Sequence, residues 1–200
     1  EEAQRQAPAN FQVLAILERL DELGVHSRSS DHYDDELKEE HVVLPGAQQA
    51  LTILTPAEAG VNWNGGFGLD KSGTQLWSGA PTLLEWLCND SPKSQEWRVR
   101  LDGSRVCELG CGCHALVGLG ISKQLGAAHV CLTDLPHMLP LIRANVAANR
   151  GGDDGGSVEA RALAWGTTSG SIIEEPWDVI VAADVCFDAE MIVPLADTLS

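Results

Sequence analysis

Basic residues are scarce in this sequence. Its 200 residues include 13 Lys and Arg against 29 Asp and Glu, which gives a formal net charge of −16 and a pI near 4.5. Proteins that bind nucleic acids need clustered Lys and Arg to neutralise phosphates, so this composition excludes that class of partner. The acidic surface suits a basic partner, or it serves only to keep the protein in solution.

Long apolar runs are missing as well. No stretch reaches the roughly 20 apolar residues of a membrane-spanning helix. No charged start followed by a short apolar core marks a secretory signal. The sequence therefore predicts a protein without membrane partners, in the cytoplasm or alternatively in the nucleus.

The six cysteines do not predict disulfides. Several fall inside runs that are typical of buried strands, where cysteine behaves as a small hydrophobe, and this pattern fits a reducing compartment. Cys111, Cys113 and His114 lie close together, but no second ligand pair follows at the spacing of a zinc site. We therefore expect no metal.

Residues 1–72 differ in pattern from the rest, and we interpret them as an extension packed on a domain formed by residues 73–200. The expected elements are a capped amphipathic helix over 10–24, a solvated acidic run over 31–41, β-rich stretches over 41–46 and 50–56 that could pair as a hairpin, and a glycine-rich connection over 62–73.

From residue 73 onward, helical and strand patterns alternate. Helices are predicted over 74–87, 115–126 and 135–150, with another beginning at 189, and strands over 105–110, 129–134, 157–165 and 177–187. Short links between alternating elements are typical of a doubly wound, mostly parallel sheet with helices on both faces. The fold class is therefore α/β.

Two glycines and an acid mark a candidate ligand site. Gly110 and Gly112 end one predicted strand, where bare backbone lets a ligand approach and helix N-termini present amide groups. A tight turn with no ligand would use the same glycines. Asp134 ends the next strand, where it can accept hydrogen bonds from ribose hydroxyls or cap the helix that follows. The pattern fits NAD or S-adenosylmethionine, although Ala115 stands where NAD sites usually keep a third glycine.

Five ordered stretches resemble a known family: GTQLWSGAPTLLEWL, VCELGCGC, TDLPHMLPLIRANVAAN, ALAWG and WDVIVAADVCFD. They are similar to the successive motifs of the seven-β-strand S-adenosylmethionine-dependent methyltransferases, and more narrowly to the methyltransferase-like family 16 group of protein lysine methyltransferases. The resemblance covers residues 73–200. It implies a Rossmann-like class I methyltransferase fold, S-adenosylmethionine as cofactor, and a monomer that methylates a lysine of a basic or lysine-presenting protein.

The resemblance also implies roles for nine residues. Glu108, Gly110 and Gly112 would lie under the methionine part of the cofactor, Asp134 at the ribose, Trp77 against the cofactor and Trp165 beside the adenine. Ala183 and Asp184 would form the mouth where the target side chain enters, and Phe187 would supply an apolar wall. The alternatives are core packing for both tryptophans and Phe187, and a cap on the following helix for Asp184.

The sequence departs from the family in three ways. Cys113, His114 and Ala115 replace the family's third glycine, so we expect a longer loop with His114 either at the cofactor carboxylate or at an exposed turn. Phe187 replaces the tyrosine of the family's DxxY motif. The family continues beyond its fourth strand, so we expect this chain to belong to a longer protein. The alternatives to an active enzyme are a catalytically silent module that binds cofactor or partner and, less well matched, an NAD-dependent oxidoreductase.

Overall fold

The computed structural model describes residues 37–47, 50–56, 71–150, 156–166, 172, 174–186 and 188–200. The helix predicted over 10–24, most of the connection predicted over 62–73, and Phe187 lie outside the described residues. Those three expectations therefore stay predictions.

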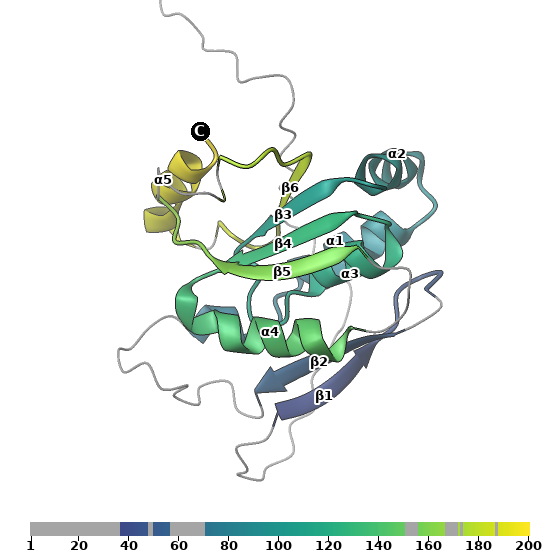
Figure 1. The fold of residues 1–200 in the computed structure, drawn as a ribbon, viewed down its shortest axis with the longest axis horizontal. Coiled ribbons are helices and arrows are strands. Elements are labelled where there is room, and N and C mark those ends of the chain that lie inside the picture. Colours follow the sequence, from purple (N-terminus) through teal and green to yellow (C-terminus); the bar gives the residue numbers. More distant parts are fainter. Residues whose placement is uncertain are drawn as a thin grey trace, which may run out of the picture.

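Four parallel strands form the central sheet (Figure 1). In chain order they are β3 (Arg105–Leu109), β4 (His129–Asp134), β5 (Ser157–Ala162) and β6 (Val179–Ala182). Their spatial order is β5-β4-β3-β6, so the chain moves outward from β3 to β5 and then returns to place β6 on the other side of β3. This reversal is the topological switch point of a doubly wound sheet, which confirms the predicted Rossmann-like fold.

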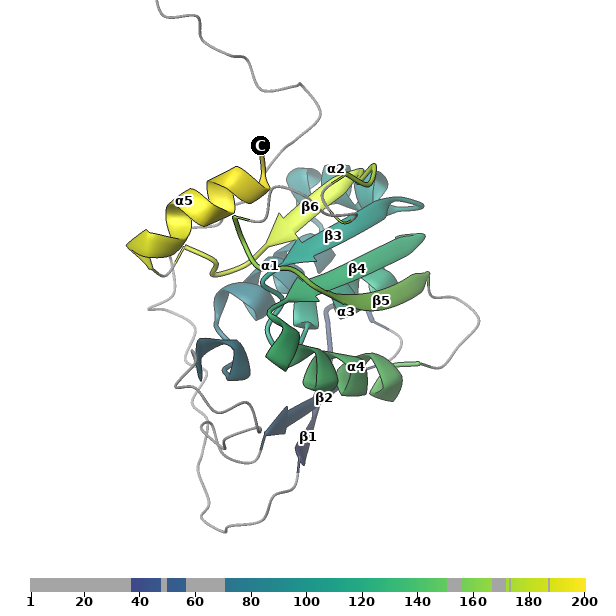
Figure 2. The ribbon, with the colours of Figure 1, turned by 60° about the vertical axis from the view of Figure 1, so that its left-hand side comes forward.

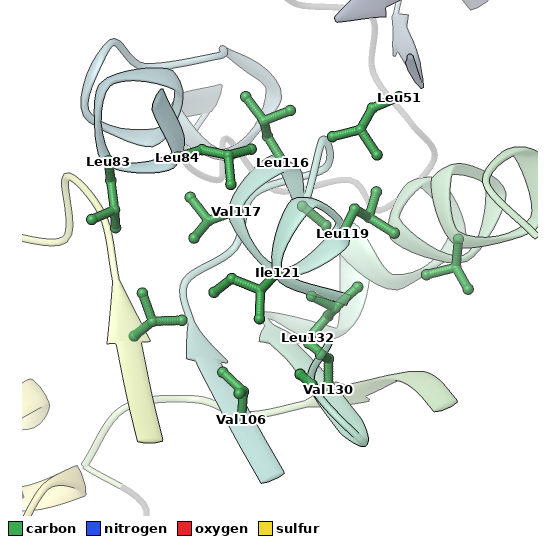
Figure 3. Packing of buried hydrophobic residues seen from close by; sticks show 14 of the residues in the cluster. Leu51, Leu83, Leu84, Val106, Leu116, Val117, Leu119, Ile121, Val130 and Leu132 are labelled. Carbon is green, nitrogen blue, oxygen red and sulfur yellow. The ribbon is translucent and has the colours of Figure 1, made fainter. Parts of the chain in front are cut away.

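Helices pack on one face of the sheet, against the side chains of alternate strand residues. Val106, Val130 and Leu132 point toward α3 (Leu116–Gln124), which in turn packs on α1 (Gly79–Cys88); Figure 3 shows this cluster. A side chain at Gly120 would collide with Leu84 of α1, so this glycine lets the two helices approach closely. The buried apolar face of α3 explains why its sequence predicts a helix so clearly.

The opposite face carries a second, smaller cluster. Cys107 and Leu109 of β3 pack there with Leu195 of α5 (Ala189–Thr198) and with Trp165. Figure 2 shows α5 on the side of the sheet away from α3 and α4 (Leu139–Ala148). The helix predicted over 135–150 begins with a short 3-10 turn, Pro136–Met138, and Pro140 lies in the first turn of α4, as expected.

Several predicted boundaries were wrong. The helix predicted over 74–87 begins only at Gly79, because residues 71–74 form a 3-10 turn. The strands predicted over 157–165 and 177–187 shorten to Ser157–Ala162 and Val179–Ala182, because the chain leaves the sheet there to line a cavity. The shifted ends at Gly79, Ala162 and Ala182 lie beside that cavity, whereas the start of β6 at Val179 lies at the other end of the sheet.

Helix α2 (Pro92–Leu101) was not predicted at all. Only Ser94 and Leu101 are buried on it, so its sequence carries little apolar periodicity. Its start nevertheless has a local signal: the Ser91 hydroxyl accepts a hydrogen bond from the Ser94 N–H at 3.2 Å, and Pro92 occupies the first turn.

The two strands before residue 57 form an antiparallel hairpin, β1 (Leu37–Val42) and β2 (Leu51–Pro56). The pairing was predicted, but the first strand was placed over 41–46 and the acidic run was expected to be solvated. Instead, β1 takes most of its residues from that run and keeps four side chains exposed, because only its backbone needs to pair with β2. Leu51 and Ile53 of β2 are fully buried in the core.

Candidate cofactor site

A cavity of about 370 Å³ opens at the switch point, beyond the carboxyl ends of β3, β4 and β6. Eight of the nine residues to which the sequence assigned roles line it: Trp77, Glu108, Gly110, Gly112, Asp134, Trp165, Ala183 and Asp184. The ninth, Phe187, lies outside the described residues. Segments more than 100 residues apart in the sequence therefore meet around one space, while the role of each side chain remains a proposal.

The glycine loop after β3 approaches the cavity with bare backbone. Gly110 and Gly112 have φ angles of 61° and 62°, which other residues adopt only with strain. A Cβ at Gly110 would lie 2.9 Å from Cζ2 of Trp165, and a Cβ at Gly112 would lie 3.2 Å from the carbonyl oxygen of Gly73. Both positions thus need glycine for backbone shape and for close packing.

The amide groups of this loop are already bound within the protein. The Cys111 N–H donates to the Thr133 carbonyl at 3.0 Å, and the Cys113 N–H donates to the Gly73 carbonyl at 2.8 Å. The Gly112 N–H donates to Oδ2 of Asp134 at 2.8 Å. A ligand would therefore meet the surface of this loop without these three donors.

Glu108 lies buried at the base of the cavity. Its Oε2 accepts a hydrogen bond from the Gly118 N–H at 2.8 Å, which fastens α3 to β3. Burial raises the pKa of Glu108 from 4.5 to about 8; the Gly118 N–H opposes this rise, and the charge of Asp134 adds to it. At neutral pH the Glu108 side chain is therefore mostly protonated.

Asp134 anchors the structure on both sides of its strand end. Its Oδ1 accepts from the Leu135 N–H at 2.7 Å, in addition to the Gly112 contact of Oδ2. Each carboxylate oxygen can accept more than one hydrogen bond, so both contacts leave room for ribose hydroxyls. The alternative weighed for Asp134, a cap on the helix that follows, is wrong: Leu135 and Met138 stand at the two helix starts after it, and neither start has a side-chain cap.

Asp184 reaches across the sheet to helix α1. Its backbone has a φ of 56°, and its Oδ2 accepts from the N–H of Gly79, the first residue of α1, at 2.6 Å. A negative charge at a helix N-terminus is favourable because it faces the positive end of the helix dipole. The alternative that Asp184 caps the following helix is wrong: Asp188 caps α5, accepting from the Glu190 N–H at 2.9 Å.

Aromatic and apolar side chains form the walls. Trp77 precedes α1 and is 46% exposed, which excludes the core-packing alternative for this residue. Trp165 is half-buried against the cluster of Cys107 and Leu109, so it serves the core and the cavity together. Sequence reasoning missed fourteen other lining residues, although Leu135 directly follows Asp134; among them are Leu76, Leu135, His137, Met138 and Met191.

His114 is buried and lines the cavity, so its assignment to an exposed turn was wrong. Burial lowers the pKa of its imidazole to about 4, which keeps the ring neutral. Ala115, which follows His114 and precedes α3, has a left-handed φ of 47°. His114 can therefore offer one ring N–H to a ligand without adding a positive charge.

The charges around the cavity are of one sign. The carboxylates of Asp134 and Asp184 line it, Glu108 beside them is mostly protonated, and no Lys or Arg is among the described lining residues. Across the part of the chain that the structure describes, no three His, Cys, Asp or Glu side chains gather in a way that could hold a metal ion. No helix in those same segments is long and apolar enough to cross a membrane.

The fold defines an α/β protein of the doubly wound class, with its cavity at the switch point where such folds bind their ligands. A family model described as lysine methyltransferase matches residues 66–200, and the chain belongs to that family.

Curated relatives agree with this family. The chain is 31% identical over 134 residues to a calmodulin-lysine N-methyltransferase of Arabidopsis thaliana, covering 66% of this chain and 42% of the relative. It is 30% identical over 166 residues to an EEF1A lysine methyltransferase 3 of Xenopus tropicalis, covering 83% and 61%. It is 34% identical over 124 residues to the protein N-lysine methyltransferase METTL21A of Danio rerio, covering 62% and 52%. The chain thus spans about half the length of the curated relatives it matches.

Proposed function

We propose that this chain is the S-adenosylmethionine-binding part of a protein lysine methyltransferase. The cavity carries this proposal: it is lined by the carboxylates of Asp134 and Asp184 and by no described Lys or Arg. S-adenosylmethionine is cationic at its sulfonium and amine, so such a lining complements it. Membership of the family supports the same reading.

The same cavity is a poor match to NAD. A pyrophosphate usually binds to the backbone amides at the N-terminus of the helix after the glycine loop. Here the Gly118 N–H, in the first turn of α3, is bound to Oε2 of Glu108. The loop amides of Cys111, Gly112 and Cys113 before that helix are bound to other protein oxygens. The carboxylates that line the cavity would also repel the negatively charged pyrophosphate. Both features disfavour the oxidoreductase alternative.

The residues present fit the proposed cofactor. Asp134 would hold the ribose hydroxyls, Trp165 and Leu135 would enclose the adenine, and Gly110 and Gly112 would admit the methionine part. When bound, S-adenosylmethionine supplies a methyl group activated on a sulfonium. The chain's own task is to position a neutral lysine amine in line with that group and to exclude water, because the displacement needs little covalent help.

We place the lysine entrance beside Ala183 and Asp184, with Phe187 as an apolar wall. Asp184 is bonded through Oδ2 to α1, so Oδ1 is the oxygen that can attract the incoming ammonium group. A carboxylate stabilises the charged form of lysine, so we assign Asp184 to orientation and not to proton removal. The expected acceptor is a basic or lysine-presenting protein, met by a monomer in the cytoplasm or nucleus.

Calorimetry with S-adenosylmethionine, S-adenosylhomocysteine and NAD, side by side, tests the cofactor. Binding of the first two without NAD is expected, and binding of NAD alone would overturn the proposal. Labelled S-adenosylmethionine added with lysate proteins to the full-length protein then tests transfer. Label on a protein lysine is the expected result, whereas cofactor binding without any transfer would favour the silent module.

A further inference from the structure

Two asparagines of α4 bind the edge of the hairpin as a neighbouring strand would. Asn149 accepts from the Thr52 N–H at 2.9 Å and donates to the Thr52 carbonyl at 2.6 Å. One turn earlier, Asn145 accepts from the Leu54 N–H at 2.6 Å and donates to the Leu54 carbonyl at 2.9 Å. Each side-chain amide thus satisfies both backbone groups of one β2 residue, so α4 closes an edge that would otherwise lack partners.

Asn145 differs from Asn149 by one contact. Its Nδ2 also donates to the carbonyl oxygen of Cys113 at 2.9 Å, inside the glycine loop. Asn145 is fully buried, and an amide nitrogen has two hydrogens, so the Leu54 and Cys113 carbonyls use its whole donor capacity at short range. One side chain therefore joins the hairpin to the loop.

The bonded carbonyl lies between two residues that line the cavity, Gly112 and His114. The N–H of Cys113 is held by Gly73, so Asn145 fixes the other side of the same residue. Two residues later, Ala115 takes its left-handed turn into α3. Without the Asn145 amide, a buried carbonyl would lose its partner at the point where the loop is most constrained.

We propose that Asn145 is a positioning residue for the cofactor loop, which it couples to the β1–β2 hairpin, and that this contact sets the affinity of the cavity for S-adenosylmethionine. The inference rests on the proposed function, because it takes the cavity to be the cofactor site. It assigns the hairpin a part in ligand binding although no hairpin residue lines the cavity.

Asn149 provides a matched control for the test. Asn145→Ala and Asn149→Ala each remove two hydrogen bonds to β2, and only the first also releases the loop. Both variants should lose thermal stability. In the full-length protein, Asn145→Ala should weaken S-adenosylmethionine binding about tenfold or more in calorimetry, while Asn149→Ala should bind within about twofold of the parent. Equal affinities in the two variants would overturn the proposal.

A readout without cofactor separates this inference from the proposed function. Hydrogen exchange of the Cys111–Ala115 amides in ligand-free protein should accelerate in Asn145→Ala and stay at the parent rate in Asn149→Ala. If the parent fails to bind S-adenosylmethionine, the proposed function fails, but the exchange result still decides whether Asn145 holds the loop.

If Asn145→Ala does not fold, the coupling between hairpin and loop can be tested in the unmodified protein. Under mildly denaturing conditions, the Thr52 and Leu54 amides should exchange together with those of the glycine loop, in one cooperative opening. Opening of the hairpin while the loop amides keep their protection would overturn the coupling.

Discussion

Asp184 is one of two non-glycine residues with positive φ among those that the structure describes. That backbone turn directs its carboxylate to the N-terminus of α1, directly after the loop that carries Trp77. Asp184 therefore has a structural contact in addition to the proposed orientation of lysine. The two roles can be separated by experiment, because Asp188 also caps a helix, α5, and has no proposed role in orienting lysine.

We expect Asp184→Ala to lower the free energy of unfolding by about 1 kcal/mol, the usual loss for a helix cap, and to abolish methyl transfer. Asp188→Ala removes the cap of α5 and should lose similar stability while transfer continues. Urea unfolding and transfer assays on both variants provide the measurement. Transfer that persists in Asp184→Ala would restrict Asp184 to its capping role.

Asp134→Ala should weaken S-adenosylmethionine binding by about 1–3 kcal/mol, the range for an unsatisfied hydrogen-bond partner. This substitution also removes the acceptor of the hydrogen bond from the Gly112 N–H. Asp134→Asn keeps an oxygen acceptor, so it should retain more affinity in calorimetry. If a folded Asp134→Ala variant binds like the parent, the carboxylate is only a local anchor.

Two buried groups predict opposite effects of pH on stability. The pKa of Glu108 rises from 4.5 to about 8 on folding, so the folded state binds more protons and this contribution is lost as pH rises through about 8. The pKa of His114 falls from 6.5 to about 4, so its contribution is complete above 6.5 and is lost as pH falls.

Denaturant unfolding between pH 4 and pH 9 checks both signs. Relative to the parent, Glu108→Gln should lose less stability as pH rises toward 8, and His114→Asn should lose less as pH falls below 6.5. Parallel stability curves for parent and variants would show that neither group is coupled to folding in this way.

At the level of single elements, α3 starts from an unusual residue. Ala115 precedes the helix with φ 47° and ψ 36°, a left-handed conformation that costs an L-residue roughly 1–2 kcal/mol. Glycine would remove that cost, whereas loss of the buried methyl costs about 0.8 kcal/mol and the greater backbone freedom of glycine costs roughly a further 0.5–1 kcal/mol. These terms nearly cancel, so the position tolerates glycine better than an ordinary buried alanine does.

Ala115→Gly should therefore leave the free energy of unfolding within about 0.5 kcal/mol of the parent. Ala127, equally buried but without positive φ, is the control, and Ala127→Gly should destabilise by about 1 kcal/mol. Chemical denaturation measures both. Similar losses at the two positions would show that the turn at Ala115 is not strained.

The elements differ in how far their sequences determine them. β3 and β4 were predicted within one residue, because apolar residues lie on both faces of each strand and Gly110 or Asp134 ends it. α2 was missed because few of its residues are buried, and β1 was placed too late in the sequence because four of its six side chains are exposed. A helix or strand can be predicted from its sequence when at least one of its faces is buried.

For the molecule as a whole, motif resemblance predicted which residues meet at the cavity better than it predicted their partners. The contact between Asp184 and Gly79 spans 105 positions, and no local pattern signals it. The burial of His114 depends on how one additional loop residue is accommodated. The double role of Asn145 requires the hairpin, α4 and the glycine loop to be placed in space first.

The position of β6 beside β3 has a consequence for folding. The Arg105 N–H bonds to Asp178, 73 positions later, so this pairing closes a long loop and should form late. A nascent chain that has emerged only as far as β5 can fold three adjacent strands, yet it lacks the wall supplied by Ala183 and Asp184. A ligand of the cavity therefore meets all of these walls only after β6 has paired, and by mass action its cellular concentration should prolong the lifetime of newly made protein.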